Sequence, residues 1–189
     1  MRTILGVSGS LRRDSWNTKL LRAAAELLPP GFGFELELYD GLKAIPPYDE
    51  DDDVQPAPAA AADFRAAIAG ADGVLFATPE YNSSVPGQLK NAIDWASRPL
   101  ATNVLRNKPV AVVGASTGAF GAVWAQAELR KVLAATGARV VEGEVALGHA
   151  PTRFDEGGRL ADDAIREQLG EVVEALVSEI EQRAHLVAA

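Results

Sequence analysis

The side chains most suited to chemistry lie in residues 79–95, which read PEYNSSVPGQLKNAIDW. This stretch follows an apolar segment, residues 73–78, and begins as a polar, turn-prone loop before a helix that Pro86 can start. The loop offers the flat ring of Tyr81, the amide of Asn82 and the hydroxyls of Ser83 and Ser84. One aromatic face among many hydrogen-bonding groups suits a planar ring with polar edges better than it suits a site of hydrolysis.

A second polar loop, residues 6–17, has the composition of a phosphate site. The N–H groups at the start of a helix carry about half a positive charge. Ser10, Ser15 and Asn17 add hydrogen bonds, and the guanidinium of Arg12 matches phosphate oxygens. Neither G-x-x-x-x-G-K-[ST] nor G-x-G-x-x-G occurs in this loop, so the sequence predicts a site for a single phosphate group.

Some of these residues also have structural interpretations. Serine-rich loops often cap helices, and Asn17 is a plausible N-cap of the helix that follows. Trp16, although it belongs to the candidate binding set, suits packing better than stacking on a ligand.

Alternating strand and helix patterns must position these loops. Short β-rich runs predict strands over residues 3–7, 34–39, 73–78, 109–114 and 139–146. Helical spacing predicts helices over residues 17–28, 59–69, 86–97, 120–135 and about 161–183. The fourth strand ends in a third Gly-rich loop, residues 114–121.

The element order predicts the fold class and places the three loops together. Five strands alternating with five helices favour an α/β protein of one domain, residues 1–189, with a doubly wound parallel sheet and helices on both faces. At this length the flavodoxin-like order 2-1-3-4-5 fits best. Strands 1, 3 and 4 are then neighbours, so the loops that follow them line one crevice.

Composition excludes several other classes of protein. A net charge of −8 disfavours nucleic acids and anionic membranes as partners. The absence of cysteine excludes thiolate chemistry, and two distant histidines make a metal site improbable, so no metal is expected. With neither a signal-like start nor a spanning apolar run, the expected location is cytoplasmic.

The segments GSLRRDSWN, PEYNSSVPGQLKNAIDW and GASTG together resemble the NADPH-dependent FMN reductases, a family that includes quinone, chromate and azo-dye reductases. The resemblance spans nearly the whole chain. It implies tightly bound FMN and a homodimer or homotetramer with the flavin near a subunit interface. A departure is Trp16, where the family often has a smaller or different aromatic residue, and residues 142–150 show no family motif.

The resemblance also assigns roles to residues. It implies that the FMN phosphate is held by Ser10, Arg12, Ser15 and Asn17, that the isoalloxazine lies along Pro79, Glu80, Tyr81 and Asn82, and that the far side is closed by Ser116, Thr117 and Gly118.

The implied activity is a hydride relay from NADPH or NADH through FMN to quinones, azo compounds, metal oxyanions or free flavin. The flavin N5 carries the hydride, so no catalytic side chain is predicted. One alternative is a flavodoxin-type FMN electron carrier without NAD(P)H oxidation. A hydrolase using Ser8, Ser10 or Ser116 with His149 is disfavoured, because no G-x-S-x-G elbow occurs.

Four further features carry expectations. The acidic run 49–53 is expected to be a solvated loop rather than a cation site. Lys90 and Asp94 are spaced to pair on one helix. Arg98 and Arg106 are candidates for the 2′-phosphate of NADPH, and Trp95 and Trp124 could each serve either the core or an interface.

Overall fold

The computed structural model describes residues 1–29, 31 and 33–188. Its strands are β1 (Arg2–Ser8), β2 (Phe34–Tyr39), β3 (Gly73–Thr78), β4 (Pro109–Ala115), β5 (Arg139–Val140) and β6 (Ala146–Leu147). Its α-helices are α1 (Trp16–Glu26), α2 (Ala59–Gly70), α3 (Gly87–Ala96), α4 (Val123–Ala135) and α5 (Asp163–Ala188). Four short 3-10 helices are η1 (Gly41–Ala44), η2 (Glu50–Asp52), η3 (Leu100–Thr102) and η4 (Ala150–Thr152).

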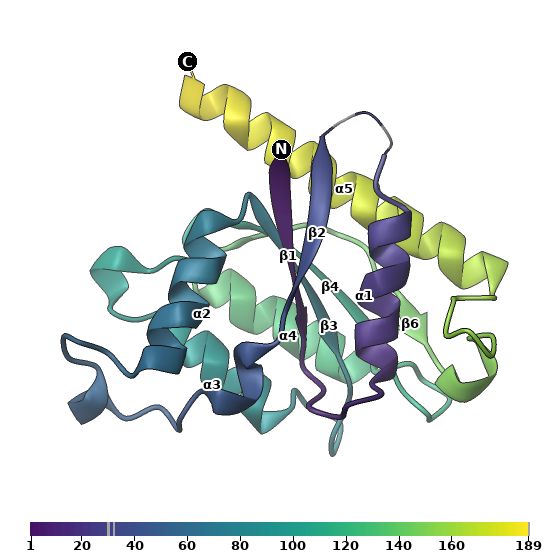
Figure 1. The fold of residues 1–189 in the computed structure, drawn as a ribbon, viewed down its shortest axis with the longest axis horizontal. Helices are drawn as coiled ribbons and strands as arrows, with labels where there is room; N and C mark the ends of the chain where they lie inside the picture. Colours follow the sequence, from purple (N-terminus) through teal and green to yellow (C-terminus); the bar gives the residue numbers. More distant parts are fainter. Residues whose placement is uncertain (30, 32, 189) are drawn as a thin grey trace.

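The sheet has the predicted order, β2-β1-β3-β4-β5, with every pair parallel. Strands β1, β3 and β4 are central, and β3 and β4 are buried along their whole length. The loops that follow these three strands gather at the lower edge of the sheet in Figure 1. The flavodoxin-like prediction is therefore confirmed.

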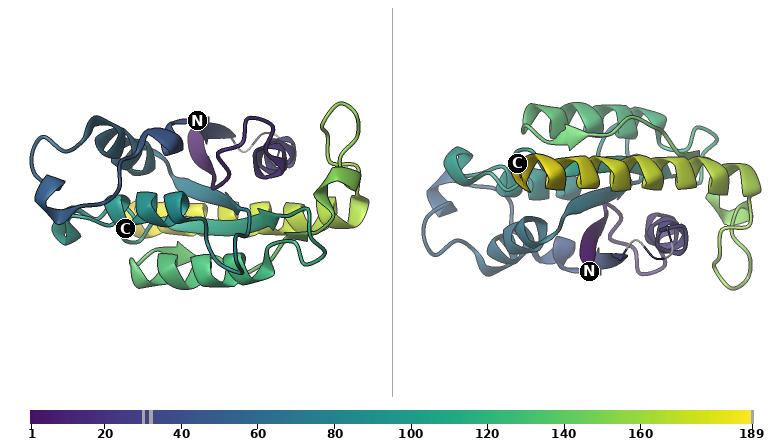
Figure 2. Two further views of the ribbon diagram at one scale, coloured as in Figure 1. Left: turned by 90° about the horizontal axis from the view of Figure 1, so that it is seen from below. Right: turned by 90° about the horizontal axis from the view of Figure 1, so that it is seen from above.

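Alternate strand residues face two separate cores, as the period of two in a strand requires. One face of the sheet packs on α1 and α5, through residues such as Leu75 and Val113. The other face packs on α2, α3 and α4, through residues such as Phe76 and Val112. In both views of Figure 2, the 26-residue helix α5 (yellow) crosses most of the width of the molecule.

The predicted fifth strand is wrong in one respect, because the chain leaves the sheet between β5 and β6. Both short strands pair with β4, but the residues between them include Gly143 with a φ of +128°. Glu144 pairs instead with Arg130 of α4 at 3.4 Å. A left-handed backbone and an outward-facing carboxylate interrupt the ladder that the apolar pattern had suggested.

Two helix starts also differ from the prediction. Helix α1 begins at Trp16 because Ser15, not Asn17, is its N-cap: the Ser15 hydroxyl accepts from the N–H groups of Asn17 and Thr18. Helix α4 begins at Val123 rather than at residue 120, because Gly121 and Ala122 both have a positive φ.

The acidic run is only partly solvated. Asp49 caps η2 by accepting from the N–H of Asp51. Asp53 turns inward and pairs with Arg65 at 2.8 Å, so the expectation of a wholly solvated loop is wrong for this residue. Across the described part of the chain, no helix is long and apolar enough to cross a membrane.

Candidate functional site

The loop after β1 lies tightly against the start of the loop after β3. The N–H of Gly9 donates to the carbonyl of Ala77 at 2.8 Å. A Cβ atom at Gly9 would lie 2.8 Å from Leu89 Cδ2 and 3.3 Å from Pro79 Cδ. Glycine at this position therefore lets the two loops approach each other, which sequence reasoning had not singled out.

Asn17 is a structural bridge at the end of β4. Its amide nitrogen donates to the carbonyl of Ala115, and its side-chain oxygen accepts from the Ala115 N–H, both at 3.0 Å. Asn17 is only 2% exposed, and its side chain ties the start of α1 to β4 with a pair of hydrogen bonds like those that a neighbouring strand would form. Asn17 also lines the depression, and its bond to the Ala115 carbonyl uses one of the two N–H groups of its amide.

Trp16 packs against another side chain of the protein, as the sequence predicted. Its ring stacks on Phe154 with centroids 5.4 Å apart, and Lys19 Nζ lies 4.3 Å above it. Lys19 also pairs with Asp14 at 2.9 Å, and this hydrogen bond lowers the pKa of the Asp14 carboxyl. Trp16 thus anchors α1 to the 154–160 segment while one part of it lines the depression.

The loop after β3 is a tight hairpin. Tyr81 and Ser84 exchange both backbone hydrogen bonds, at 3.2 and 3.1 Å. Asn82 and Ser83 between them have φ values of +53° and +58°, as a type I′ turn requires. This turn holds Tyr81 at the surface with 52% of its area exposed.

Two carboxylates fasten this hairpin to α4. Glu80 accepts from the N–H groups of Trp124 and Ala125, both at 3.1 Å, and so caps a helix that has no side-chain cap of its own. Glu128 accepts from the Ser84 hydroxyl at 2.5 Å and from the Val85 N–H at 3.3 Å. The Ser84 hydrogen bond is the main cause that lowers the pKa of Glu128.

The loop after β4 rests on the segment that follows β6. The carbonyl of Ser116 accepts from the Ala150 N–H at 3.0 Å, and the carbonyl of Gly118 accepts from the His149 N–H at 2.9 Å. A Cβ atom at Gly148 would lie 2.2 Å from the Ala119 carbonyl oxygen. The sequence did not predict these supporting residues, because residues 142–150 show no motif. Gly148 could have pointed to them, since a glycine there allows the close approach of the loop after β4.

The three loops enclose a depression of about 120 Å³ at the carboxyl edge of the sheet. It is lined by Ala115 and by ten of the twelve predicted binding residues: Ser10, Arg12, Ser15, Trp16, Asn17, Pro79, Glu80, Tyr81, Ser116 and Thr117. Asn82 and Gly118 do not line it. A larger hollow of about 290 Å³ shares Arg12 and Tyr81 with it and adds apolar surface from Leu11 and Pro86.

The donor set of the depression fits a phosphate. Arg12 contributes a guanidinium, Ser10, Ser15 and Thr117 contribute hydroxyls, and the start of α1 contributes its dipole. The one carboxylate in the lining, Glu80, already accepts from two N–H groups of α4. A phosphate dianion would therefore meet one guanidinium and several hydroxyls, beside a single carboxylate that is already hydrogen-bonded to α4.

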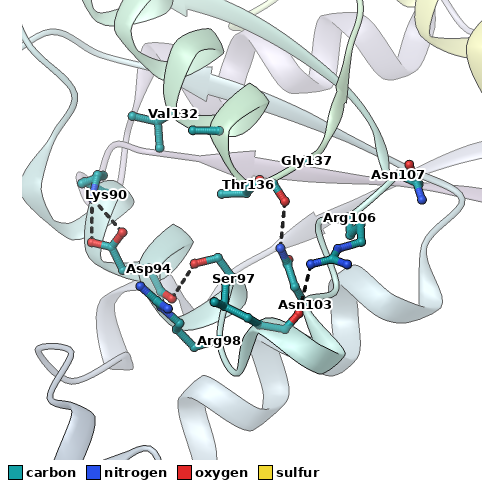
Figure 3. Close-up of a pocket in the computed structure, with 12 residues that line it drawn as sticks. Lys90, Asp94, Ser97, Arg98, Asn103, Arg106, Asn107, Val132, Thr136 and Gly137 are labelled. Carbon is teal, nitrogen blue, oxygen red and sulfur yellow. Dashed lines mark hydrogen bonds and ion pairs between the residues drawn. The ribbon is translucent and has the colours of Figure 1, made fainter.

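Arg98 and Arg106 do not lie at this depression. They line a separate cleft at the amino edge of the sheet, where α3 and α4 end (Figure 3). Because α3 runs from the hairpin to this cleft, its ten residues, about 15 Å, separate the two places. Both arginines therefore lie outside the flavin depression, and their role toward the 2′-phosphate of NADPH stays a prediction.

The remaining expectations have definite outcomes. Lys90 and Asp94 pair as predicted, at 2.7 Å. Trp95 is fully buried and its indole N–H donates to the Pro46 carbonyl at 2.9 Å, so it belongs to the core. Trp124 is 48% exposed and lies edge-on to Phe120.

A parallel sheet in this order, with a donor-rich depression at its carboxyl edge, defines a flavodoxin-like α/β protein. The chain belongs to the NADPH-dependent FMN reductase family, whose family model matches residues 2–152. It is thus an NAD(P)H-dependent oxidoreductase with FMN as its cofactor.

Individual relatives agree with this assignment. The chain is 45% identical over 174 residues to an NAD(P)H-dependent FMN reductase of Pseudomonas aeruginosa, covering 92% of each protein. It is 43% identical over 164 residues to a 2-hydroxy-1,4-benzoquinone reductase of a Burkholderia species, covering 86% of this chain and 87% of the relative. Its structure matches the flavoenzyme NAD(P)H:(acceptor) oxidoreductase FerB of Paracoccus denitrificans with a TM-score of 0.83 and 34% identity, over 96% of this chain and 98% of that one. These relatives support the reductase over the electron-carrier alternative.

Proposed function

We propose that this reductase passes electrons from NADPH or NADH to quinones, and also to azo compounds, metal oxyanions or free flavin, at the carboxyl edge of its sheet. The observation that carries the proposal is the meeting of three loops around one donor-rich depression. Bound FMN would supply the hydride chemistry that links the nicotinamide to the acceptor. The protein supplies binding, orientation and a polar frame.

The binding roles follow from where each side chain lies. Arg12, Ser10 and Ser15 would hold the FMN phosphate at the start of α1. The free N–H of the Asn17 amide would donate a further hydrogen bond, while its other groups keep β4 in place. Glycine at position 9 lets this loop lie close to Pro79.

The ring would lie along the segment from Pro79 to Asn82. The type I′ turn and the Glu80 cap fix this segment against α4. On the opposite side, the backbone of residues 116–118 is held by residues 147–150, and its N–H groups would face the negative charge that develops on the ring. No side chain of the described site is assigned a proton-transfer role.

The acceptor class is supported by the hollow beside Tyr81. It is lined by the apolar side chains of Leu11 and Pro86 next to the ring of Tyr81. A flat aromatic acceptor can lie on such a surface with few directional contacts. The match to a benzoquinone reductase supports quinones as the first acceptors to test.

We propose further that the chain assembles as a homodimer or homotetramer. Phe120 and Trp124 are 64% and 48% exposed, with ring centroids 5.1 Å apart, at the start of α4. A paired aromatic patch beside a site favours contact with another protein surface. Sedimentation equilibrium of the parent and of Phe120→Ser/Trp124→Ser tests this: a monomeric parent contradicts the assembly.

Anaerobic reduction of the purified yellow protein tests the function. We expect NADPH or NADH to bleach the bound FMN and 1,4-benzoquinone to restore the colour within one turnover. A protein that takes up FMN but is not bleached by either nucleotide would be a carrier. Failure to take up FMN would contradict the flavin site itself.

A further inference from the structure

A second cleft lies away from the flavin site. It has a volume of about 630 Å³ and sits between the last turns of α3, the connection to β4 and the end of α4. Figure 3 shows Arg98, Asn103 and Arg106 on the wall that the connection forms, with Thr136 and Gly137 opposite. This volume is in the range of small-molecule sites, which are typically about 300–1,000 Å³.

The charges around the cleft are unusual for this chain. Three cations, Lys90, Arg98 and Arg106, line it with a single acid, Asp94, which gives a local charge of +2 on a chain whose net charge is −8. Asp94 is already paired with Lys90 at 2.7 Å. Within the described residues, neither arginine forms an ion pair with a carboxylate.

The contacts of the two arginines leave most of their donors free. Arg106 Nη2 donates to the Leu100 carbonyl at 3.3 Å, which uses one of its five N–H groups. Arg98 also borders a second hollow that contains Glu50 and Asp53. Asp53 is engaged by Arg65 there, so the acid that can face Arg98 from that side is the exposed Glu50.

The wall that carries these charges is fixed in place. The Asn103 amide donates to the Thr136 carbonyl at 2.8 Å, and its oxygen accepts from the Leu105 N–H at 2.9 Å. The Asn107 N–H donates to the Gly137 carbonyl at 2.8 Å. The connection is thereby tied to the end of α4, so a ligand would meet a preorganised surface and lose less entropy on binding.

We propose that this cleft is a second binding site, specific for a phosphorylated small organic molecule. Guanidinium forks match phosphate oxygens better than an ammonium does, and two of them flank the same wall. Leu100, Val132 and Ala135 supply apolar lining for the organic part of the ligand. The length of α3 separates the cleft from the flavin depression, and the two share no lining residue.

Titration of the FMN-loaded protein with AMP and, separately, with inorganic phosphate tests the proposal. Isothermal titration calorimetry gives the affinity, and backbone amide shifts in NMR spectra give the location. We expect AMP to shift amides of residues 97–107 and 135–137 and to bind more tightly than phosphate. In the double variant Arg98→Gln/Arg106→Gln, AMP affinity should fall at least tenfold, because two charge-assisted hydrogen-bonding groups are lost.

A matched control separates the site from general charge. Arg22 and Arg159 are exposed arginines elsewhere on the surface, so Arg22→Gln/Arg159→Gln removes the same charge and should leave AMP affinity unchanged. Equal affinity of the cleft variant and the parent would overturn the site, as would AMP shifts confined to residues 8–17 and 116–118. Phosphate binding as tight as AMP binding would overturn the assignment of an organic ligand.

Discussion

The bridge between Asn17 and Ala115 makes a sharp prediction about stability. In Asn17→Ala the N–H and the carbonyl of Ala115 both lose their partner, at a residue that is 2% exposed. A buried backbone group without a partner costs about 1–3 kcal/mol, so the free energy of unfolding should fall by about 2–5 kcal/mol. For a domain of this size the melting temperature should then fall by roughly 5–15 °C.

Thermal and urea unfolding of the FMN-free protein measure this effect without the ligand. Arg22→Ala on the exposed face of the same helix is the control and should change stability by less than about 0.5 kcal/mol. Asn17→Asp should not restore stability, because a carboxylate oxygen would then face the Ala115 carbonyl. An FMN-free Asn17→Ala protein as stable as the parent, with weakened FMN binding alone, would refute the bridge and leave Asn17 only as a ligand.

Three further predictions concern other contacts. The Ser84 hydrogen bond lowers the pKa of Glu128 in the folded state, so the ionised carboxylate stabilises the fold. This stabilisation is present above the unfolded pKa and is lost as the pH falls through the folded pKa. In acid unfolding curves below about pH 4.5, Glu128→Gln should therefore lose stability less steeply than the parent. Burial lowers the pKa of Lys108 to about 8 in the folded state, so the folded protein loses this proton before the unfolded chain does. The parent should therefore become more stable between pH 8 and 10.5. Urea unfolding of Lys108→Met over the same pH range should lack that rise. Gly148→Ala should displace the 116–121 loop and so weaken FMN binding. In Gly118→Ala the new Cβ would lie 3.5 Å from Ser116 Oγ, an ordinary contact, so this variant should fold and unfold like the parent.

The sequence predicted the fold because its signals were local. Continuous apolar runs bounded by Gly-rich loops located β3 and β4 closely, and the order 2-1-3-4-5 then brought three loops to one edge. The composition of these loops was enough to gather ten of the twelve binding residues at one depression.

Long-range contacts account for what could not be predicted. The residues around Asn17 predict a helix cap. Its role as a bridge depends on contact with Ala115, which is 98 residues away in the sequence. Glu80 likewise reads as part of a polar loop, but it caps α4 from another loop. Arg98 and Arg106 follow the PEYN segment in sequence, yet α3 carries the chain to the opposite edge of the sheet before they occur.

The difference between FMN and riboflavin affinity tests the central claim most directly, because the two ligands differ only in the phosphate. The parent should bind FMN much more tightly than riboflavin. In Arg12→Gln we expect FMN affinity to fall by about 10- to 100-fold, the worth of a charge-assisted hydrogen bond of about 1.5–3 kcal/mol, with riboflavin affinity unchanged. The same preference for FMN in the parent and in Arg12→Gln would contradict a phosphate site in the loop after β1.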